Sequence, residues 1–274
     1  MPSDLHMHTS FSDGRLTPEE LIAEAKKAGL HYIALTDHDT VDGISHLYES
    51  GLFPTKGIHI IPGIEFSAHH PLHEVHILGY GIDIFCTSLL DKLNEVTDAR
   101  WSRFSEIVEK LNGLGYAITE ADVLAIAGVS KSISRSHIGR VLVKKGYFDS
   151  VRSAFEELLS KGQPAYVPHY RLEVEEVLSL ILAAEGRAVL AHPKLVYDEE
   201  LVERICQMGI DGIEVFYPQH DEDDTAHYLE LAKKYGLLPA GGSDFHGFPI
   251  RYPTEIGVFT IPDEYAVPFY RAEN

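Results

Sequence analysis

Residues 31–38, His31-Tyr32-Ile33-Ala34-Leu35-Thr36-Asp37-His38, decide the fold because a short apolar run leads directly into side chains that can bind a metal. Similar apolar runs recur along the chain, at residues 58–61, 188–191, 212–216 and 237–240. Several are followed by residues of helical period. This alternation of buried strands with helices predicts an α/β sheet or barrel.

The first predicted helix has a clear beginning and end. Thr17-Pro18-Glu19-Glu20 supplies a capping side chain, a proline suited to the first helical position and early acidic residues. Leu21, Ile22 and Ala25 follow at helical spacing, and Gly29 is expected to end the helix.

From about residue 88 to residue 163 the pattern changes to long amphipathic helices without a strand-like run. Apolar residues recur there at three- and four-residue spacing: Leu90, Leu93, Val96, Trp101, Phe104, Ile107, Val108 and Leu111. We therefore expect a helical insertion, residues 88–163, that forms a small cap over a barrel made of residues 1–87 and 164–274. No internal repeat is evident.

The composition excludes several classes of protein. The chain has 274 residues, is 45% hydrophobic and carries a formal net charge of −19, from 23 basic and 42 acidic residues. The size and apolar content suit a buried core, and the acidic surface argues against broad binding of duplex DNA or of membranes.

The cellular setting is inferred from what the chain lacks. No stretch approaches the roughly 18 consecutive apolar residues of a membrane-spanning helix, and the first residues do not resemble a signal peptide. Cys86 and Cys206 lie far apart and show no metal-binding spacing, so they are expected to be reduced thiols. We expect a cytoplasmic protein.

Metal-capable side chains stand where the predicted strands end. His38, Glu65 and His192 each follow a strand, and Asp244 and His246 follow the run at residues 237–240. In an α/β barrel the catalytic groups lie at this end of the strands. The sequence therefore predicts one site built from distant segments.

One pair of histidines and two single residues are ambiguous as metal ligands when each is considered alone. His6 and His8 in Asp4-Leu5-His6-Met7-His8 point to the same side of an extended segment and can share an ion, although histidines in a half-exposed strand show the same spacing. His76 by itself is better explained as a buried core histidine, and Asp13 by itself as an ordinary turn residue. The wider pattern favours metal binding for all four.

Taken together, these segments resemble the polymerase-and-histidinol-phosphatase (PHP) family. The matching motifs occur in the family's order and span nearly the whole chain: residues 4–10, 12–14, 36–39, 62–65, His76, 191–193 and 242–246. The resemblance implies a distorted (β/α)7 TIM-like barrel that carries two or three divalent metal ions.

The same resemblance implies which residues hold each ion. One set is His6, His8, Glu65 and Asp244, with Glu65 bridging to a second ion held by His76 and His192, and a third set is Asp13, His38 and His246. Asp13 stands where some members have histidine. A carboxylate is a harder donor and suits manganese or magnesium better than imidazole does, so we expect Mn²⁺, with Fe²⁺, Zn²⁺ or Mg²⁺ as alternatives.

Within the family the chain is similar to the branch of nucleotide phosphatases and 5′-3′ exoribonucleases, through the helical insertion and Ser134-Arg135-Ser136-His137-Ile138-Gly139-Arg140. The resemblance implies hydrolysis of nucleoside 3′,5′-bisphosphates, such as adenosine 3′,5′-bisphosphate, or of short 5′-phosphorylated RNA. Arg135 and His137 are the candidate phosphate-binding residues. Alternatively, Arg135 and Arg140 lie on a solvated helix face.

Other residues have weaker assignments. Lys161, Tyr166 and His169 are expected to line the pocket, and Glu65, His192 and His246 are the candidate catalytic residues, with one of the histidines giving a proton to the leaving group. The remaining histidines are treated as surface or core residues: His31, His46, His59, His69, His70, His73, His220 and His227.

Two rival functions remain open. A histidinol-phosphate phosphatase would use the same metal ligands on a substrate with one phosphate and an amine. A catalytically silent binding or regulatory module would keep the barrel and lose ligands, whereas here all nine expected positions hold metal-capable residues.

Overall fold

The structure, a computed structural model, describes residues 1–70, 72–170, 172–248 and 252–271. Its main sheet has six strands in sequential order: β2 (Tyr32–Leu35), β3 (His59–His69), β4 (Glu74–Tyr80), β5 (Arg187–Leu190), β6 (Gly212–Phe216) and β7 (Leu238–Gly241). β4 runs antiparallel to both neighbours, and the other pairs are parallel. The apolar runs predicted as strands are all confirmed, with boundaries within one residue at their starts.

Residues 4–8 connect the two edges of this sheet. The backbone N–H of Ala34, in β2, donates to the carbonyl of Asp4 at 3.0 Å, and that of His8 donates to the carbonyl of Phe245, beyond β7, at 2.9 Å. Isolated parallel bridges pair Asp4 with Ile33 and Met7 with Phe245. The sheet therefore curls so that its edges approach one another, and His6 and His8 sit at the seam.

A glycine permits this close approach. A Cβ atom on Gly242 would lie 2.4 Å from the backbone nitrogen and from the Cβ of His6, a distance that no real side chain adopts. A short second sheet pairs β1 (Pro2–Ser3) with β8 (Ile261–Pro262) next to the seam.

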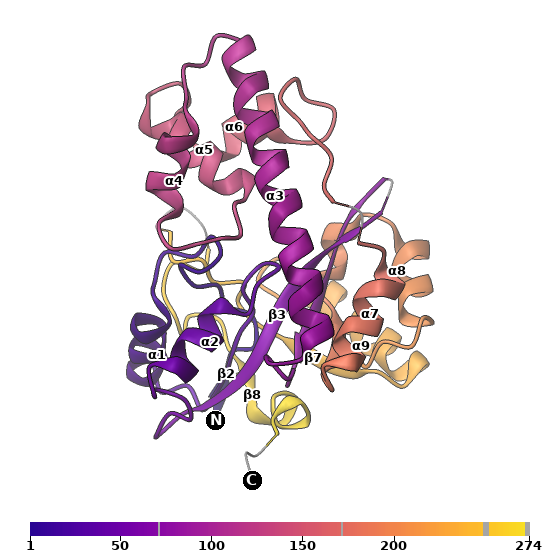
Figure 1. Cartoon of the computed structure of the whole chain (residues 1–274). Coiled ribbons are helices and arrows are strands. Elements are labelled where there is room, and N and C mark those ends of the chain that lie inside the picture. The colour runs from indigo at the N-terminus through magenta and orange to yellow at the C-terminus, as the bar shows by residue number, and fades with distance from the viewer. Residues whose placement is uncertain (71, 171, 249–251, 272–274) are drawn as a thin grey trace.

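Helices follow the strands and cover the sheet (Figure 1). They are α1 (Pro18–Lys27), α2 (Asp42–Glu49), α7 (Val174–Ala183), α8 (Glu199–Cys206) and α9 (Glu222–Tyr235). The start of α1 is as predicted, since Thr17 and Glu20 form a capping box and Pro18 takes the first turn. Leu21, Ile22 and Ala25 face the core, and Gly29 follows the end of the helix at φ +73°.

The predicted helical segment comprises α3 (Thr87–Gly113), α4 (Glu120–Ala127), α5 (Arg135–Lys144), α6 (Val151–Ala154) and a π-helical turn, Phe155–Leu159. In Figure 1 the far half of α3 and the next three helices stand away from the sheet. They share an apolar core of their own, which includes Phe104, Leu111 and Leu142. The near half of α3 instead packs into the main core through Leu89 and Leu93.

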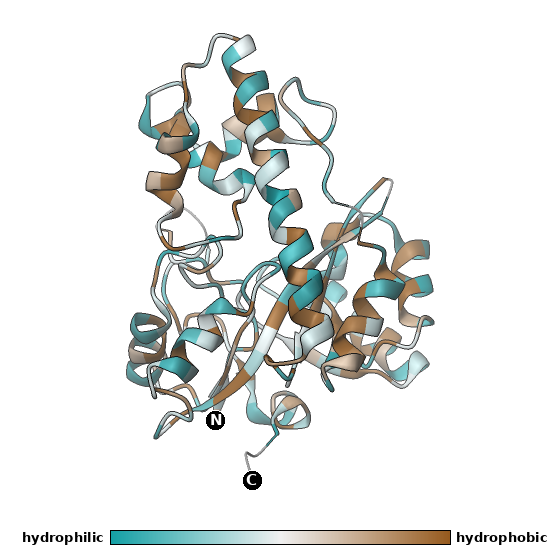
Figure 2. Ribbon diagram, in the orientation of Figure 1, coloured by the Kyte–Doolittle hydropathy of each residue, from teal (hydrophilic) through white to brown (hydrophobic). Residues whose placement is uncertain are grey.

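The helices are two-sided, as expected for elements that cover a core. Figure 2 shows apolar and polar residues alternating along α3, α7 and α8. Among the described residues, no helix combines the length and the apolar character that crossing a bilayer requires.

Candidate metal centre

Glu65 in β3 is the side chain around which the predicted ligands gather. The sequence places it after a strand, but β3 continues to His69, so Glu65 lies within the strand and pairs opposite Leu78. It is 1% exposed. Five imidazole nitrogens approach its carboxylate oxygens, at 3.4 Å for His6, 3.3 Å for His8, 3.0 Å for His38, 2.8 Å for His76 and 3.0 Å for His192.

The remaining predicted ligands lie directly beside these histidines. Asp244 Oδ1 is 3.1 Å from His8 Nε2, and Asp13 Oδ1 is 3.1 Å from His246 Nε2 and 3.9 Å from His38 Nε2. The structure therefore brings all nine predicted metal-capable residues into one cluster. They come from the seam at residues 4–8, the turn that follows it, β3, β4 and the segments after β2, β5 and β7.

Three groups within this cluster have ligand atoms close enough to share an ion. In each group the candidate atoms lie within 4.8 Å of one another: His6, His8, Glu65 and Asp244; His8, Asp13, His38 and His246; and His38, Glu65 and His76. The first group equals one set implied by the family resemblance. The second adds His8 to the expected set, and the third contains His38 in place of His192, whose Nε2 is 3.0 Å from Glu65.

The donor atoms fit divalent cations. Several of them are buried and have no hydrogen-bond partner among the described residues: His6 Nε2, His8 Nε2, His38 Nδ1, His246 Nε2, Asp13 Oδ1 and Glu65 Oε2. A buried polar atom without a partner is costly, and carboxylates facing imidazoles are a common ligand set for divalent ions. These atoms therefore suit cations placed between them.

The charges within the cluster are mutually dependent. Burial works against ionisation of Glu65, but His38, His76 and His6 together hold its pKa well below the usual value. Burial also lowers the pKa of His8 well below its usual value, and His246 and His38 add to this effect. These directions favour the carboxylate form of Glu65 and the neutral imidazole form of His8, the forms in which both side chains bind metals.

Glu214 in β6 is a residue of the site that sequence reasoning missed. It is fully buried, its Oε1 lies 3.0 Å from His6 Nδ1, and its Oε2 accepts the backbone N–H of His192 at 2.7 Å. Such a contact fixes the ring orientation and the tautomer of a ligand histidine. The signal in the sequence was an acidic residue in the middle of the apolar run Gly212-Ile213-Glu214-Val215-Phe216.

Two arginines on α3 were also missed. Arg100 forms an ion pair with Asp39 and donates to Ser67 Oγ, whereas Arg103 donates to the carbonyl of Val167 at 2.9 Å and lies 2.8 Å from His169 Nε2. Both are under 10% exposed. They occupy positions on the apolar stripe of the predicted helix, and this misplacement of charge was the available signal.

The two predicted phosphate-binding residues have different surroundings. The side chain of Arg135 is 11% exposed, forms a 2.5 Å ion pair with Glu74 and stacks its guanidinium against the rings of Phe155 and Tyr166. His137 is 1% exposed, and its Nδ1 accepts the backbone N–H of Ser134 at 3.0 Å. Burial lowers the pKa of His137 to about 4, so it is neutral and internally bonded.

Cavities adjoin the cluster on more than one side. One of about 660 Å³ is lined by Asp13, His38 and His76 and by Arg100, Arg103 and Arg135. A second, of about 430 Å³, contains Arg135 with Lys161, Tyr166 and His169, and a third, of about 370 Å³, includes Glu65, His192 and Asp244. Lys161, Tyr166 and His169, which the sequence predicted to line the pocket, thus share one cavity with Arg135.

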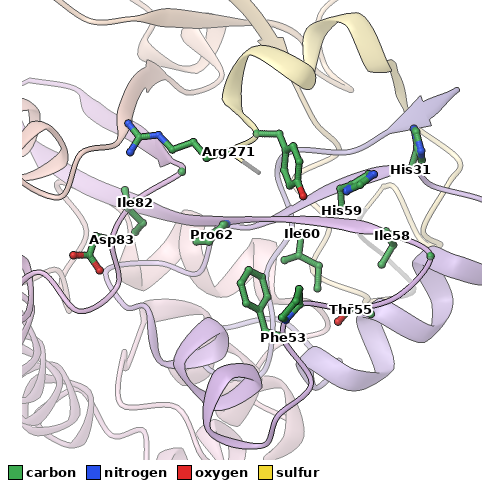
Figure 3. A pocket seen from close by; sticks show the side chains of 14 residues that line it. His31, Phe53, Thr55, Ile58, His59, Ile60, Pro62, Ile82, Asp83 and Arg271 are labelled. Atoms are coloured by element: carbon green, nitrogen blue, oxygen red, sulfur yellow. The ribbon is translucent and has the colours of Figure 1, made fainter. Parts of the chain in front are cut away.

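A separate apolar cavity lies at the other ends of the strands (Figure 3). Its volume is about 600 Å³, and its lining includes His31 and His59 at the starts of β2 and β3 and Phe53, Ile60 and Ile82. It contains none of the nine clustered residues. The polar groups needed for chemistry therefore lie at the opposite end of the sheet.

The comparisons with known proteins agree with this geometry. A 3′,5′-nucleoside bisphosphate phosphatase from Chromobacterium violaceum is 34% identical over 249 residues, which cover 89% of this chain and 86% of that protein. The 5′-3′ exoribonuclease Rnm from Escherichia coli is 33% identical over 250 residues, covering 89% and 84%. A solved structure assigned as a metal-dependent phosphoesterase, from Bifidobacterium adolescentis, superposes with a TM-score of 0.87 at 29% identity, covering 97% of this chain and 94% of that one.

The match to a family model covers most of the residues that build the site. The PHP domain model matches residues 4–174, which contain six of the nine clustered residues. The resemblance inferred from the motifs is thereby confirmed, and the chain belongs to the PHP domain family.

Proposed function

We propose that the chain is a metal-dependent phosphoesterase that removes phosphate from nucleoside 3′,5′-bisphosphates and acts on short 5′-phosphorylated RNA. The observation that carries this proposal is the cluster of buried, mutually facing carboxylates and imidazoles around Glu65. The named activities of the relatives, a nucleoside bisphosphate phosphatase and a 5′-3′ exoribonuclease, support the choice of substrate. The chain is an enzyme that hydrolyses phosphoric esters of small substrates.

The proposed cofactor is two or three divalent ions, with Mn²⁺ favoured. All nine clustered residues would hold them: His6, His8, Asp13, His38, Glu65, His76, His192, Asp244 and His246. The set mixes three carboxylates with six imidazoles, a combination that suits manganese, iron or zinc better than magnesium alone. When bound, such ions neutralise phosphoryl charge and make a water molecule acidic enough to attack at neutral pH.

The protein's own groups would then bind and orient the substrate. Arg135, held by Glu74 and by two aromatic rings, and Arg103, in the same cavity, offer cations to a second phosphate. The helices of the insertion carry both arginines, so the cap would close over the anionic ligand. In this proposal His137 holds the start of α5 in place through Ser134, which leaves Arg135 as the phosphate donor of the pair.

The proton for the departing hydroxyl would come from His192 or His246. Both rings belong to the cluster, where they are 8% and 2% exposed, and the donor has to reach the leaving oxygen.

The proposal includes the domain division expected from the sequence. Residues 1–87 and 164–274 form the barrel, in which the extended segment at residues 4–8 takes the place of a seventh strand between β2 and β7. Residues 88–163 form the cap, supported by the separate apolar core of the helices.

A phosphate-release assay with added Mn²⁺ tests the function. Adenosine 3′,5′-bisphosphate, a short 5′-phosphorylated RNA and histidinol phosphate are compared, and we expect release from the first and cleavage of the second. His8→Ala and Glu65→Ala should abolish turnover, whereas His227→Ala, on the surface of α9, should have no effect.

The alternative outcomes are distinct. Turnover of histidinol phosphate alone would establish the rival phosphatase. A purified protein that contains no manganese, iron or zinc and stays inactive after each is added would establish the silent binding module. Undiminished activity in Glu65→Ala would refute the proposed metal centre.

A further inference from the structure

The ligand cluster lies between two cavities of different chemistry. The cavity of about 660 Å³ is lined by Arg100, Arg103 and Arg135, whereas the lining of the cavity of about 370 Å³ includes Leu195 and Tyr197 and, among the described residues, no arginine. The two cavities adjoin one another, because both are lined by His38, Glu74, His76, Tyr217 and Gln219. A substrate whose phosphate lies at the cluster can therefore extend into either cavity.

Tyr197 stands at the rim of the smaller cavity with its side chain in solvent. It is 81% exposed, more than any other large apolar side chain among the described residues. Its backbone adopts the left-handed conformation, at φ 56° and ψ 24°, which few residues other than glycine or asparagine take up. A single exposed aromatic is common on protein surfaces, but here it forms part of a cavity that also contains Glu65 and His192.

The loop that carries Tyr197 is fixed relative to the cluster. A 3₁₀ turn, Pro193–Val196, joins it to His192, and the N–H of Leu195 donates to the carbonyl of His192 at 2.9 Å. Val196 is buried, and Lys194 forms an ion pair with Asp224 at the start of α9. The tyrosine ring is thus presented from a short, anchored segment.

We propose that the smaller cavity binds the second nucleotide of an RNA chain and that the Tyr197 ring is the surface on which its base stacks. This inference rests on the proposed function. The 5′-terminal nucleotide occupies the arginine-lined cavity, where its 5′-phosphate meets cations, and the scissile phosphate lies at the cluster. Exposed aromatic rings are the usual platforms for bases of single-stranded nucleic acids, and they accept any base.

The chemistry explains how one centre serves both substrates. In a nucleoside 3′,5′-bisphosphate and at the first linkage of 5′-phosphorylated RNA, water adds to phosphorus and the P–O3′ bond breaks. O3′ leaves with the electron pair and takes up a proton, while the hydroxyl from water stays on phosphorus. The only difference is that the RNA phosphorus keeps its ester bond to O5′ of the next nucleotide. That nucleotide needs a second cavity, and a bisphosphate does not.

The test compares KM for two probes, adenosine 3′,5′-bisphosphate and a 5′-phosphorylated RNA tetranucleotide, in the metal-loaded protein. Loss of one base–aromatic stack corresponds to a change of about tenfold in binding. We expect Tyr197→Ala to raise the ratio of the RNA KM to the bisphosphate KM by about tenfold, and Tyr197→Trp to preserve the ratio. Leu182→Ala, which removes an equally exposed apolar side chain from α7, should leave it unchanged.

Three outcomes would overturn the inference. They are KM values that Tyr197→Ala leaves unchanged for both probes, an equal rise in KM for both probes, which would indicate a disturbed His192 loop, and a wild-type protein that hydrolyses the bisphosphate but not the RNA. Failure of the wild type on both probes would instead count against the proposed function, so the two failures are distinguishable.

Discussion

Replacement of Glu214 by glutamine tests whether this buried carboxylate positions the metal centre. Both of its oxygens accept hydrogen bonds, one from His6 Nδ1 at 3.0 Å and one from the backbone N–H of His192 at 2.7 Å. The amide of glutamine has one acceptor oxygen and one donor NH₂ group. In Glu214→Gln, one of the two donors must therefore face another donor or lose its partner.

The expected loss of Mn²⁺ affinity follows from the burial of Glu214, His6 and His192. A buried donor left without a partner costs about 1–3 kcal/mol, which is about fivefold to 150-fold in an equilibrium constant. Loss of a partner behind a ligand histidine usually lowers metal affinity or activity by about 10- to 100-fold. We therefore expect Mn²⁺ to bind Glu214→Gln at least about tenfold more weakly than wild type.

The assay is a titration of Mn²⁺ into metal-free protein in competition with a chelating dye, with circular dichroism to verify folding. Glu175→Gln, which changes an exposed glutamate on α7, is the matched control and should bind Mn²⁺ as the wild type does. Wild-type affinity in a folded Glu214→Gln protein would refute the positioning role. A uniform loss of folding would be seen by circular dichroism and resolved with the more conservative Glu214→Asp.

Two other predictions concern the insertion. Arg135→Ala should raise KM for adenosine 3′,5′-bisphosphate by about tenfold or more while kcat changes less, because a buried, charge-assisted phosphate contact is lost. Arg187→Ala on β5 is the control and should leave KM unchanged. An unchanged KM in Arg135→Ala would exclude the contact. Arg100→Leu should lower the free energy of unfolding by about 3–5 kcal/mol, because Asp39 remains buried and charged, and adding Asp39→Leu should restore part of it. Urea unfolding measures this, and equal losses in the single and double variants would contradict it.

Much of the site was predictable because ligand chemistry restricts the residue types. Histidine and carboxylate side chains that end apolar runs are uncommon, so their recurrence after four such runs predicted the cluster. Glu65 illustrates the limit of that reasoning. The residue was identified, but β3 continues past it, because β4 folds back as an antiparallel partner and pairs as far as His69.

The residues that support the cluster were not predictable with the same rules. Arg100 and Arg103 stand on the apolar stripe of the predicted helix, but their partners, Asp39 and the carbonyl of Val167, are set only when α3 packs against the sheet and the insertion. Those partners lie 61 and 64 residues away in the sequence. No local sequence pattern indicates a contact between residues that are so far apart in the chain.

The sequence alone determined most of the strands and helices, the family and which residues were expected to cluster, because hydrophobic periodicity and metal-ligand chemistry are local properties of the chain. Only the tertiary structure decided that His6 and His8 meet residues after β7 at a seam, and that Glu214 lies behind them. It also decided that the centre opens into an arginine-lined cavity on one side and a tyrosine-rimmed cavity on the other. These features depend on how the sheet curls and where the cap packs, which are set by the sum of many distant contacts.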